Sequence, residues 1–283
     1  MIKLLQSADA SNLFVYNLSR FAALLFVGLR KTEPTRVRIK RAIWSWILLT
    51  RLFWGDLMAK RKPAQKSAAQ AIEMLKRGND RFVNECFNDP KSDDTLRNLK
   101  QRTHLVDGQL PWAVVLCCAD SRVPPEFVFD CGLGEIFTIR VAGNVANSES
   151  IASVEYAAIK SIGKIGANLV VVLGHEGCGA IEAAIKNAAA PKPADLGPHI
   201  NRLLSYLTPS VGKLSPKRVK EFDNKSTSDK KKSGTLTAAV KSNALNSVSE
   251  LNSLSSLIPN EDGLVVVPAI YRLATGKVDF FEA

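Results

Sequence analysis

The sequence predicts an α/β fold, with a central, mainly parallel β-sheet, flanking helices and an antiparallel edge strand at the C-terminal end. Apolar runs at 112–117, 136–141 and 168–173 are typical of buried strands. Helical patterns alternate with these runs, which favours parallel strands joined by right-handed crossovers. The segments 264–267 and 277–281 are joined through a Thr-Gly turn, which indicates an antiparallel hairpin at the sheet edge.

The helix expected before the first strand has a clear beginning. Ser67 with Gln70 three residues later is a capping box, and Gly78 is expected to end the helix. A polar stretch with two turn signals, Asp89-Pro90 and Asp107-Gly108, leads from this helix to the strand at 112–117.

Three further helices are expected after the first strand. Ser148 can cap the first of them, and Gly163 can close it. Four of its residues are expected to face inward: Ile151, Val154, Ala158 and Ile162. The second runs from Gly179 to about Ala189. The third carries five apolar residues at helical spacing: Val240, Leu245, Val248, Leu251 and Leu254.

The positive charge of the chain lies almost entirely at its N-terminal end. The formal net charge of the 283 residues is +11, but residues 1–67 carry 13 Lys and Arg against three acidic residues, and the remainder carries 25 against 24. The body is therefore nearly neutral, and we expect no nucleic-acid partner. Its 46% hydrophobic and 23% charged residues are typical of a soluble globular protein.

Residues 1–66 are predicted to form a basic N-terminal extension, followed by a catalytic domain at 67–283. The apolar patches at 21–29 and 43–49 are shorter than the roughly 20 residues of a spanning helix. The extension fits a transit peptide, a helix lying on a membrane surface, or a misassigned start with translation beginning at Met58. We expect a cytoplasmic protein, membrane-associated or organelle-targeted if the extension is real, with membrane contact only through residues 1–57.

A second basic segment lies within the body. Residues 211–234 are rich in Lys, Ser and Asp and include Lys230-Lys231-Lys232. Such a run is usually a solvated surface, so an exposed, mobile excursion is expected here.

The cysteines indicate a metal site rather than a disulfide framework. Their number is odd, and Cys86, Cys117 and Cys131 are expected to be buried small hydrophobic side chains. Cys118 ends the first apolar run, while His175 and Cys178 end the run at 168–173. The carboxyl ends of parallel strands meet at one edge of a sheet, which brings these three groups together.

Three nitrogen and sulfur ligands are the set that a catalytic zinc site uses when its fourth position stays open. We therefore expect one Zn²⁺ per chain, bound by Cys118, His175 and Cys178. Asp120 is close enough to the metal to orient a bound hydroxide. Arg122 can hold that carboxylate in a bidentate ion pair, which keeps it ionised and away from the metal.

The motifs Cys-x-Asp-Ser-Arg at 118–122 and His-x-x-Cys-Gly at 175–179 resemble those of the β class of carbonic anhydrases. Four further segments match the same family: 78–82, 108–111, 134–137 and 263–266. The resemblance extends over roughly residues 68–283, apart from 211–234. It implies a β-carbonic anhydrase-like fold and a zinc-dependent lyase, carbonate dehydratase, in which zinc-bound hydroxide converts carbon dioxide reversibly to bicarbonate and a proton.

The resemblance also implies substrate contacts and an oligomer. By position, Gln109 matches a glutamine that hydrogen-bonds substrate, and Gly179 offers a backbone N–H at a helix start. Phe137, and Tyr156 from the neighbouring subunit, match the apolar walls of the site. The minimum unit would be a homodimer or a higher even oligomer, and Asp120 would coordinate zinc in a closed, inactive state.

One position departs from a subtype of that family. The bicarbonate-regulated subtype usually carries Trp three residues before the first zinc cysteine, where this chain has Val115, and this disfavours that subtype.

Two alternatives to a carbonic anhydrase remain open from the sequence. One is hydrolysis of carbon disulfide or carbonyl sulfide on the same scaffold, and the other is a non-catalytic zinc protein attached to a membrane through residues 1–57.

Overall fold

A computed structural model describes residues 65–87, 98–163, 165–192 and 194–282 of the chain. Backbone contacts group Gln65–Ala283 into one compact unit. The expectations about the N-terminal extension concern residues that lie almost entirely outside the described ranges. Within these ranges, no helix combines the length and the apolar character that crossing a membrane requires.

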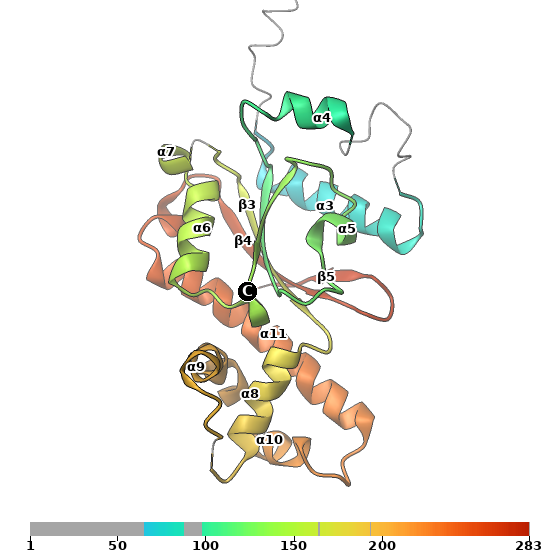
Figure 1. Cartoon of the computed structure of the whole chain (residues 1–283), viewed down its shortest axis with the longest axis vertical. Helices are drawn as coiled ribbons and strands as arrows, with labels where there is room; N and C mark the ends of the chain where they lie inside the picture. Colours follow the sequence, from blue (N-terminus) through green and yellow to red (C-terminus); the bar gives the residue numbers. More distant parts are fainter. Residues whose placement is uncertain (1–64, 88–97, 164, 193, 283) are drawn as a thin grey trace, which may run out of the picture. The chain divides into compact units, whose positions relative to one another are not determined.

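The sheet has the predicted mixed topology, with strand order β2-β1-β3-β4-β5 (Figure 1). Its strands are β1 (Ala113–Cys117), β2 (Ile136–Arg140), β3 (Leu169–His175), β4 (Val265–Tyr271) and β5 (Val278–Phe280). The pairings of β1 with β2, β1 with β3 and β3 with β4 are parallel, while β5 pairs antiparallel with β4 at the edge. The fold class predicted from the sequence is confirmed.

The helices cover both faces of the sheet and extend beyond its carboxyl edge. They are α3 (Ala68–Val83), α4 (Leu99–His104), α5 (Pro125–Val128), α6 (Ser148–Ala158), α7 (Lys160–Gly163), α8 (Gly179–Ala189), α9 (Pro198–Gly212), α10 (Pro216–Phe222) and α11 (Asp229–Leu254), with 3₁₀ turns η1 (Ala142–Asn144) and η2 (Ile258–Asn260). Figure 1 shows α8, α9 and α10 gathered below the sheet, beside α11.

Side chains alternate along β1, which gives the sheet two apolar faces. Val115 packs in one core with Ala71 and Leu75 of α3. Val114 packs in a second core with Val154 of α6 and Val248 of α11. All five residues of β1 and all seven of β3 are buried. Burial on both faces explains why these strands are continuous apolar runs rather than alternating ones.

The first helix begins where predicted but does not end at Gly78. The Ser67 capping box is present, and α3 continues to Val83. A Cβ at position 78 would lie 1.8 Å from the carbonyl oxygen of Phe129. The glycine therefore serves a close approach between α3 and the end of α5, and this packing outweighs its low helix propensity.

The residue after this glycine joins three distant parts of the chain. The side chain of Asn79 donates to the carbonyl oxygens of Val128 at 3.0 Å and Gly276 at 2.8 Å, and it accepts from the backbone N–H of Val278 at 2.9 Å. Because Asn79 is only 6% exposed, these bonds satisfy a buried amide fully. They tie α3 to α5 and to the β4–β5 hairpin.

The helix after β2 differs from its prediction in three details. Its N-cap is Asn147 rather than Ser148, because the Asn147 side chain accepts from the backbone N–H of Ser150 at 2.9 Å. The helix ends at Ala158, before the separate turn α7, so Gly163 closes α7 instead. Ile162 consequently lies off the buried face and is 47% exposed, contrary to the prediction.

Residues 211–234 include α10 and the first turns of α11, and most of their side chains are exposed, as expected from the sequence. The expected mobility of this segment stays a prediction. Val219 and Phe222 of α10 are buried in the core, which anchors this lysine-rich segment. One further expectation is wrong: Cys86 is exposed, whereas Cys117 and Cys131 are buried as predicted.

The contact at position 78 predicts the effect of a single methyl group. We expect Gly78→Ala to lower the free energy of unfolding by roughly 1–3 kcal/mol, because the Cβ must displace backbone. Gly234→Ala is the matched control: this glycine lies inside α11, and an added Cβ would meet no atom within 4 Å. That change should be neutral or should stabilise by up to about 1 kcal/mol. Equal stabilities in urea denaturation would contradict the packing explanation.

Candidate metal centre

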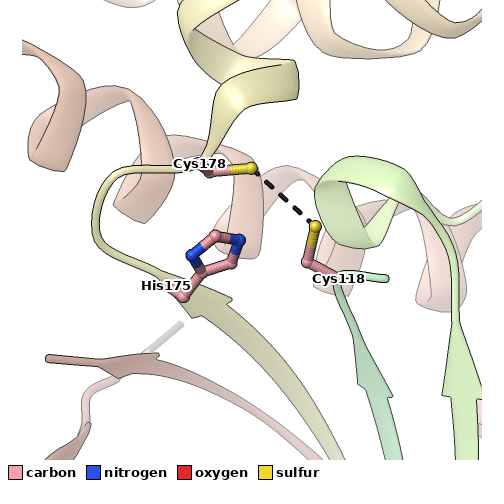
Figure 2. Close-up of side chains that lie close together, drawn as sticks. All are labelled: Cys118, His175 and Cys178. Atoms are coloured by element: carbon pink, nitrogen blue, oxygen red, sulfur yellow. Dashed lines mark hydrogen bonds between the residues drawn. The ribbon is translucent and has the colours of Figure 1, made fainter. Parts of the chain in front are cut away.

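Three potential metal ligands meet at the carboxyl edge of the sheet. Cys118 directly follows β1, His175 ends β3, and Cys178 lies in the loop between β3 and α8. Their ligand atoms all lie within 4.8 Å of one another, and all three residues are buried. Figure 2 shows the imidazole and the two sulfur atoms directed toward a common point. The structure thus brings together the three ligands predicted from the sequence.

The imidazole is oriented for metal binding. Nδ1 of His175 lies 2.8 Å from the carbonyl oxygen of Glu176, so this nitrogen is the donor in the neutral ring. Nε2 then carries the lone pair, and it is buried with no hydrogen-bond partner among the described residues. A buried polar atom without a partner is costly, and a cation facing Nε2 would satisfy it.

The two sulfur atoms have nearly the spacing that tetrahedral zinc requires. Sγ of Cys118 lies 4.0 Å from Sγ of Cys178, against about 3.8 Å expected for two thiolates bound to one tetrahedral zinc ion. The Cys178 thiol hydrogen-bonds to Cys118 and lowers the pKa of Cys118. The same bond, together with burial, raises the pKa of Cys178. The donor set and its spacing fit zinc.

Backbone N–H groups stabilise negative charge on the Cys118 sulfur atom. The N–H of Gly143 donates to Sγ of Cys118 at 3.3 Å, and the N–H of Asp120 also lowers the pKa of that thiol. Cys178 is the N-cap of α8 but makes no side-chain capping hydrogen bond, and the backbone N–H groups of Ile181 and Ala180 only partly oppose the rise in its pKa. Such bonds favour the thiolate form that a metal ligand needs.

Asp120 and Arg122 form the bidentate pair that the sequence predicts. Nε of Arg122 donates to Oδ1 of Asp120 at 2.9 Å, and a terminal guanidinium nitrogen donates to Oδ2 at 2.7 Å. The same guanidinium donates to the carbonyl oxygen of Gly177 at 3.2 Å. The Arg122 side chain holds the pKa of the Asp120 carboxyl well below its usual range. This carboxylate is therefore ionised at neutral pH and turned toward the guanidinium.

Sequence reasoning missed Arg140, a second arginine that braces the same loop. Arg140 is the last residue of β2 and donates to the carbonyl oxygens of Cys118 at 3.2 Å and Asp120 at 2.5 Å. Its position at a strand end beside the cysteine strand was the available signal, because adjacent parallel strands end at the same edge.

Arg272 was also missed, and it supports the loop of the other two ligands. It follows β4 and pairs with Glu176 at 2.8 Å and with Asp279 at 2.8 Å. The backbone N–H of Glu176 also donates to the carbonyl oxygen of Tyr271 at 3.0 Å. These contacts tie the loop between His175 and Cys178 to the β4–β5 hairpin.

The predicted substrate contacts are only partly assembled within one chain. Gly179 begins α8 beside Cys178, as predicted, and a Cβ added there would meet no atom within 4 Å. Gln109 is exposed and precedes the amino end of β1, opposite to the edge that carries Cys118. Phe137 and Tyr156 pack against each other with ring centroids 6.2 Å apart.

Phe137 borders the core of the opposite sheet face. It packs against the apolar core that contains Val114 and Val154, whereas Cys118 and Cys178 belong to the other core. Tyr156 is 48% exposed, so its ring is open to a further contact. Neither ring is brought to the cluster of its own chain.

Comparison with known proteins gives concordant results. The family model described as carbonic anhydrase matches residues 113–278. Carbonic anhydrase 2 of Mycobacterium tuberculosis is 39% identical over 141 residues, which cover 50% of this chain and 63% of that relative. The carbonic anhydrase of Mycolicibacterium smegmatis is 35% identical over 156 residues, which cover 54% of this chain and 70% of that relative. The chain thus spans less than two thirds of the first relative's length.

Solved structures with the same fold include two β-carbonic anhydrases. One of the tetrameric enzymes of Sordaria macrospora has a TM-score of 0.54 at 19% identity, over 66% of this chain and 88% of its own. The Coccomyxa enzyme in complex with acetazolamide has a TM-score of 0.54 at 21% identity, over 72% of this chain and 83% of its own. At these identities the likeness establishes the fold alone.

The cluster predicts which cysteine substitutions abolish metal binding. Cys178→Ala removes one of three ligands and should leave the purified chain with much less than one zinc per chain. Cys117→Ala is the matched control, because Cys117 is equally buried and adjacent to Cys118 but lies outside the cluster. It should retain zinc in elemental analysis. Full zinc occupancy in the Cys178 variant would contradict the ligand assignment.

Proposed function

This chain belongs to the β-carbonic anhydrase family, and from that premise we propose that it catalyses the reversible hydration of carbon dioxide to bicarbonate and a proton. The observation that carries the proposal is the buried Cys-His-Cys cluster with an ionised carboxylate beside it. A structural zinc site closes its fourth position with another protein ligand, whereas the cluster in the described residues has three.

Cys118, His175 and Cys178 would hold one Zn²⁺ per chain. When bound there, the metal supplies a nucleophile near neutral pH by lowering the pKa of a coordinated water. Two thiolates and a neutral imidazole bring the net charge of the site close to zero, so the surrounding protein groups matter for the acidity of that water. The N–H of Gly143, which donates to the Cys118 sulfur atom, would withdraw part of the charge of that thiolate.

Asp120 would orient the attacking water. Its carboxylate follows Cys118 by two residues, and its depressed pKa keeps it a hydrogen-bond acceptor at neutral pH. Both of its oxygens accept from Arg122, which holds the carboxylate outside the ligand cluster. The open fourth position therefore depends on this ion pair. A closed state in which Asp120 leaves Arg122 and binds zinc is part of the proposal.

The placement of Gln109, Phe137 and Tyr156 favours a homo-oligomer. In one chain, Gln109 lies at the amino side of β1, and the two rings border the core opposite to Cys118. They can contribute to substrate binding only at the cluster of a second copy of the chain. We therefore propose a homodimer, or a higher even oligomer, as the active unit, with carbon dioxide and bicarbonate as ligands.

The activity is tested by stopped-flow hydration of carbon dioxide with zinc-loaded full chain at pH 8.5. We expect proton release well above the uncatalysed rate and little hydrolysis of carbonyl sulfide or carbon disulfide, assayed in parallel. A zinc-loaded, folded chain without hydration activity would overturn the proposal. Activity confined to the sulfur-containing substrates would instead support a hydrolase on the same scaffold.

The role of Asp120 predicts a separate effect on turnover. Asp120→Asn keeps the size of the side chain but removes the charge, so zinc should remain bound while kcat falls on the order of 10²-fold. Asp195→Asn is the control, because Asp195 is an exposed carboxylate near α9 that bonds Gly197 and Asn201 instead. Unchanged turnover of the Asp120 variant from pH 7 to 9 would argue against an orienting role.

A further inference from the structure

We propose that Asn243, near the middle of α11, is a positioning residue for the metal ligand Cys118. Its side chain binds the carbonyl oxygen of Gly143, the residue whose N–H donates a hydrogen bond to the Cys118 sulfur atom. Asn243 would thereby set how much charge this thiolate gives to the metal. The inference rests on the proposed zinc site. Asn243 lies 125 positions from Cys118 in the sequence.

Gly143 is the direct donor in this arrangement. Its N–H lies 3.3 Å from Sγ of Cys118, within the turn η1 that follows β2. The residue adopts φ +69°, a left-handed conformation that glycine tolerates best. A Cβ at this position would approach Leu207 of α9 to 3.1 Å and Ala180 of α8 to 3.4 Å. The N–H therefore points at the sulfur only while this unusual turn is held.

Asn243 holds the other side of the same residue. Its Nδ2 donates to the carbonyl oxygen of Gly143 at 2.7 Å, and its Oδ1 accepts from Oγ of Ser210 in α9 at 3.2 Å. Asn243 is 1% exposed and Ser210 is 0% exposed. Because both ends of the amide are engaged, its orientation is determined, and the donor group must face Gly143.

The peptide between Gly143 and Asn144 is thus fixed at both of its polar atoms. Its carbonyl oxygen accepts from Asn243, and its N–H donates to the carbonyl oxygen of Val141 at 2.9 Å. Ser247, one helical turn beyond Asn243, donates to the next carbonyl oxygen, that of Asn144, at 3.1 Å. The N–H that faces Cys118 belongs to the preceding peptide, between Ala142 and Gly143, and Cα of Gly143 joins the two peptides. Loss of the Asn243 bond would free Cα of Gly143 to shift and would carry the donor away from the sulfur atom, whereas the Ser247 bond acts one peptide further on.

A hydrogen bond to a metal thiolate changes the electronic character of the metal. The N–H stabilises charge on sulfur, which weakens donation to the metal and raises the energy of thiolate-to-metal charge transfer. In a site with two thiolates, such a bond increases the acidity of the coordinated water. A residue that only fills the core would not alter this property.

The test uses full-length chain loaded with Co²⁺, whose thiolate-to-metal absorption reports directly on the sulfur ligands. Asn243→Leu removes the donor at similar volume and should shift this absorption to lower energy, with zinc affinity about tenfold weaker in chelator competition. Asn243→Ala, which should show the same red shift, is measured as well, in case the leucine variant does not fold. Ser247→Ala is the matched control, because it loses one buried hydrogen bond of the same helix face and should keep the parental spectrum.

The outcomes distinguish failure of the positioning role of Asn243 from failure of the proposed zinc site. A red shift in either folded Asn243 variant, absent from Ser247→Ala, supports the positioning role. Parental spectra and zinc affinities in the folded Asn243 variants would overturn it, and so would equal shifts in the Asn243 and Ser247 variants. If the parental chain binds cobalt without thiolate-to-metal absorption, the zinc site of the proposed function fails instead. If both Asn243 variants fail to fold while Ser247→Ala folds, Asn243 is a determinant of folding and the positioning role is rejected.

Discussion

The parallel pairing of β1 with β3 is the constraint on which the site depends. Leu116 pairs with Val172 and Cys117 with Leu173, so both strands reach the carboxyl edge of the sheet together. Every residue of these strands is buried, and a register shift by one residue would exchange the two apolar faces. Hydrophobic burial therefore fixes the separation of Cys118 from His175, which are 57 positions apart in the sequence.

Around that fixed edge, the surrounding elements determine the electrostatics of the ligands. Two arginines at strand ends, Arg140 and Arg272, hold the backbone and side chains of the two ligand loops. The Asp120–Arg122 pair adds a carboxylate that stays ionised beside the cluster. The sheet thus positions the ligands, the N–H of Gly143 stabilises negative charge on Cys118, and Arg122 holds the Asp120 carboxylate outside the ligand cluster.

The ligands and the sheet could be predicted from the sequence because each depends on local pattern. Cys118 and His175 each end an apolar run, and the spacing from Asp120 to Arg122 is short. Arg140 and Asn243 could not be assigned in this way, because their partners lie 20 to 100 residues away. The role of Gly78 was misjudged because its close approach to the Phe129 backbone outweighs its low helix propensity.

The central claim is that two cysteines and one histidine bind zinc with one position left for water. X-ray absorption at the zinc edge of the purified full chain tests it most directly. The account predicts two sulfur neighbours at about 2.3 Å and two nitrogen or oxygen neighbours at about 2.0–2.1 Å. A shell with three or four sulfur atoms, or one without sulfur, would contradict it.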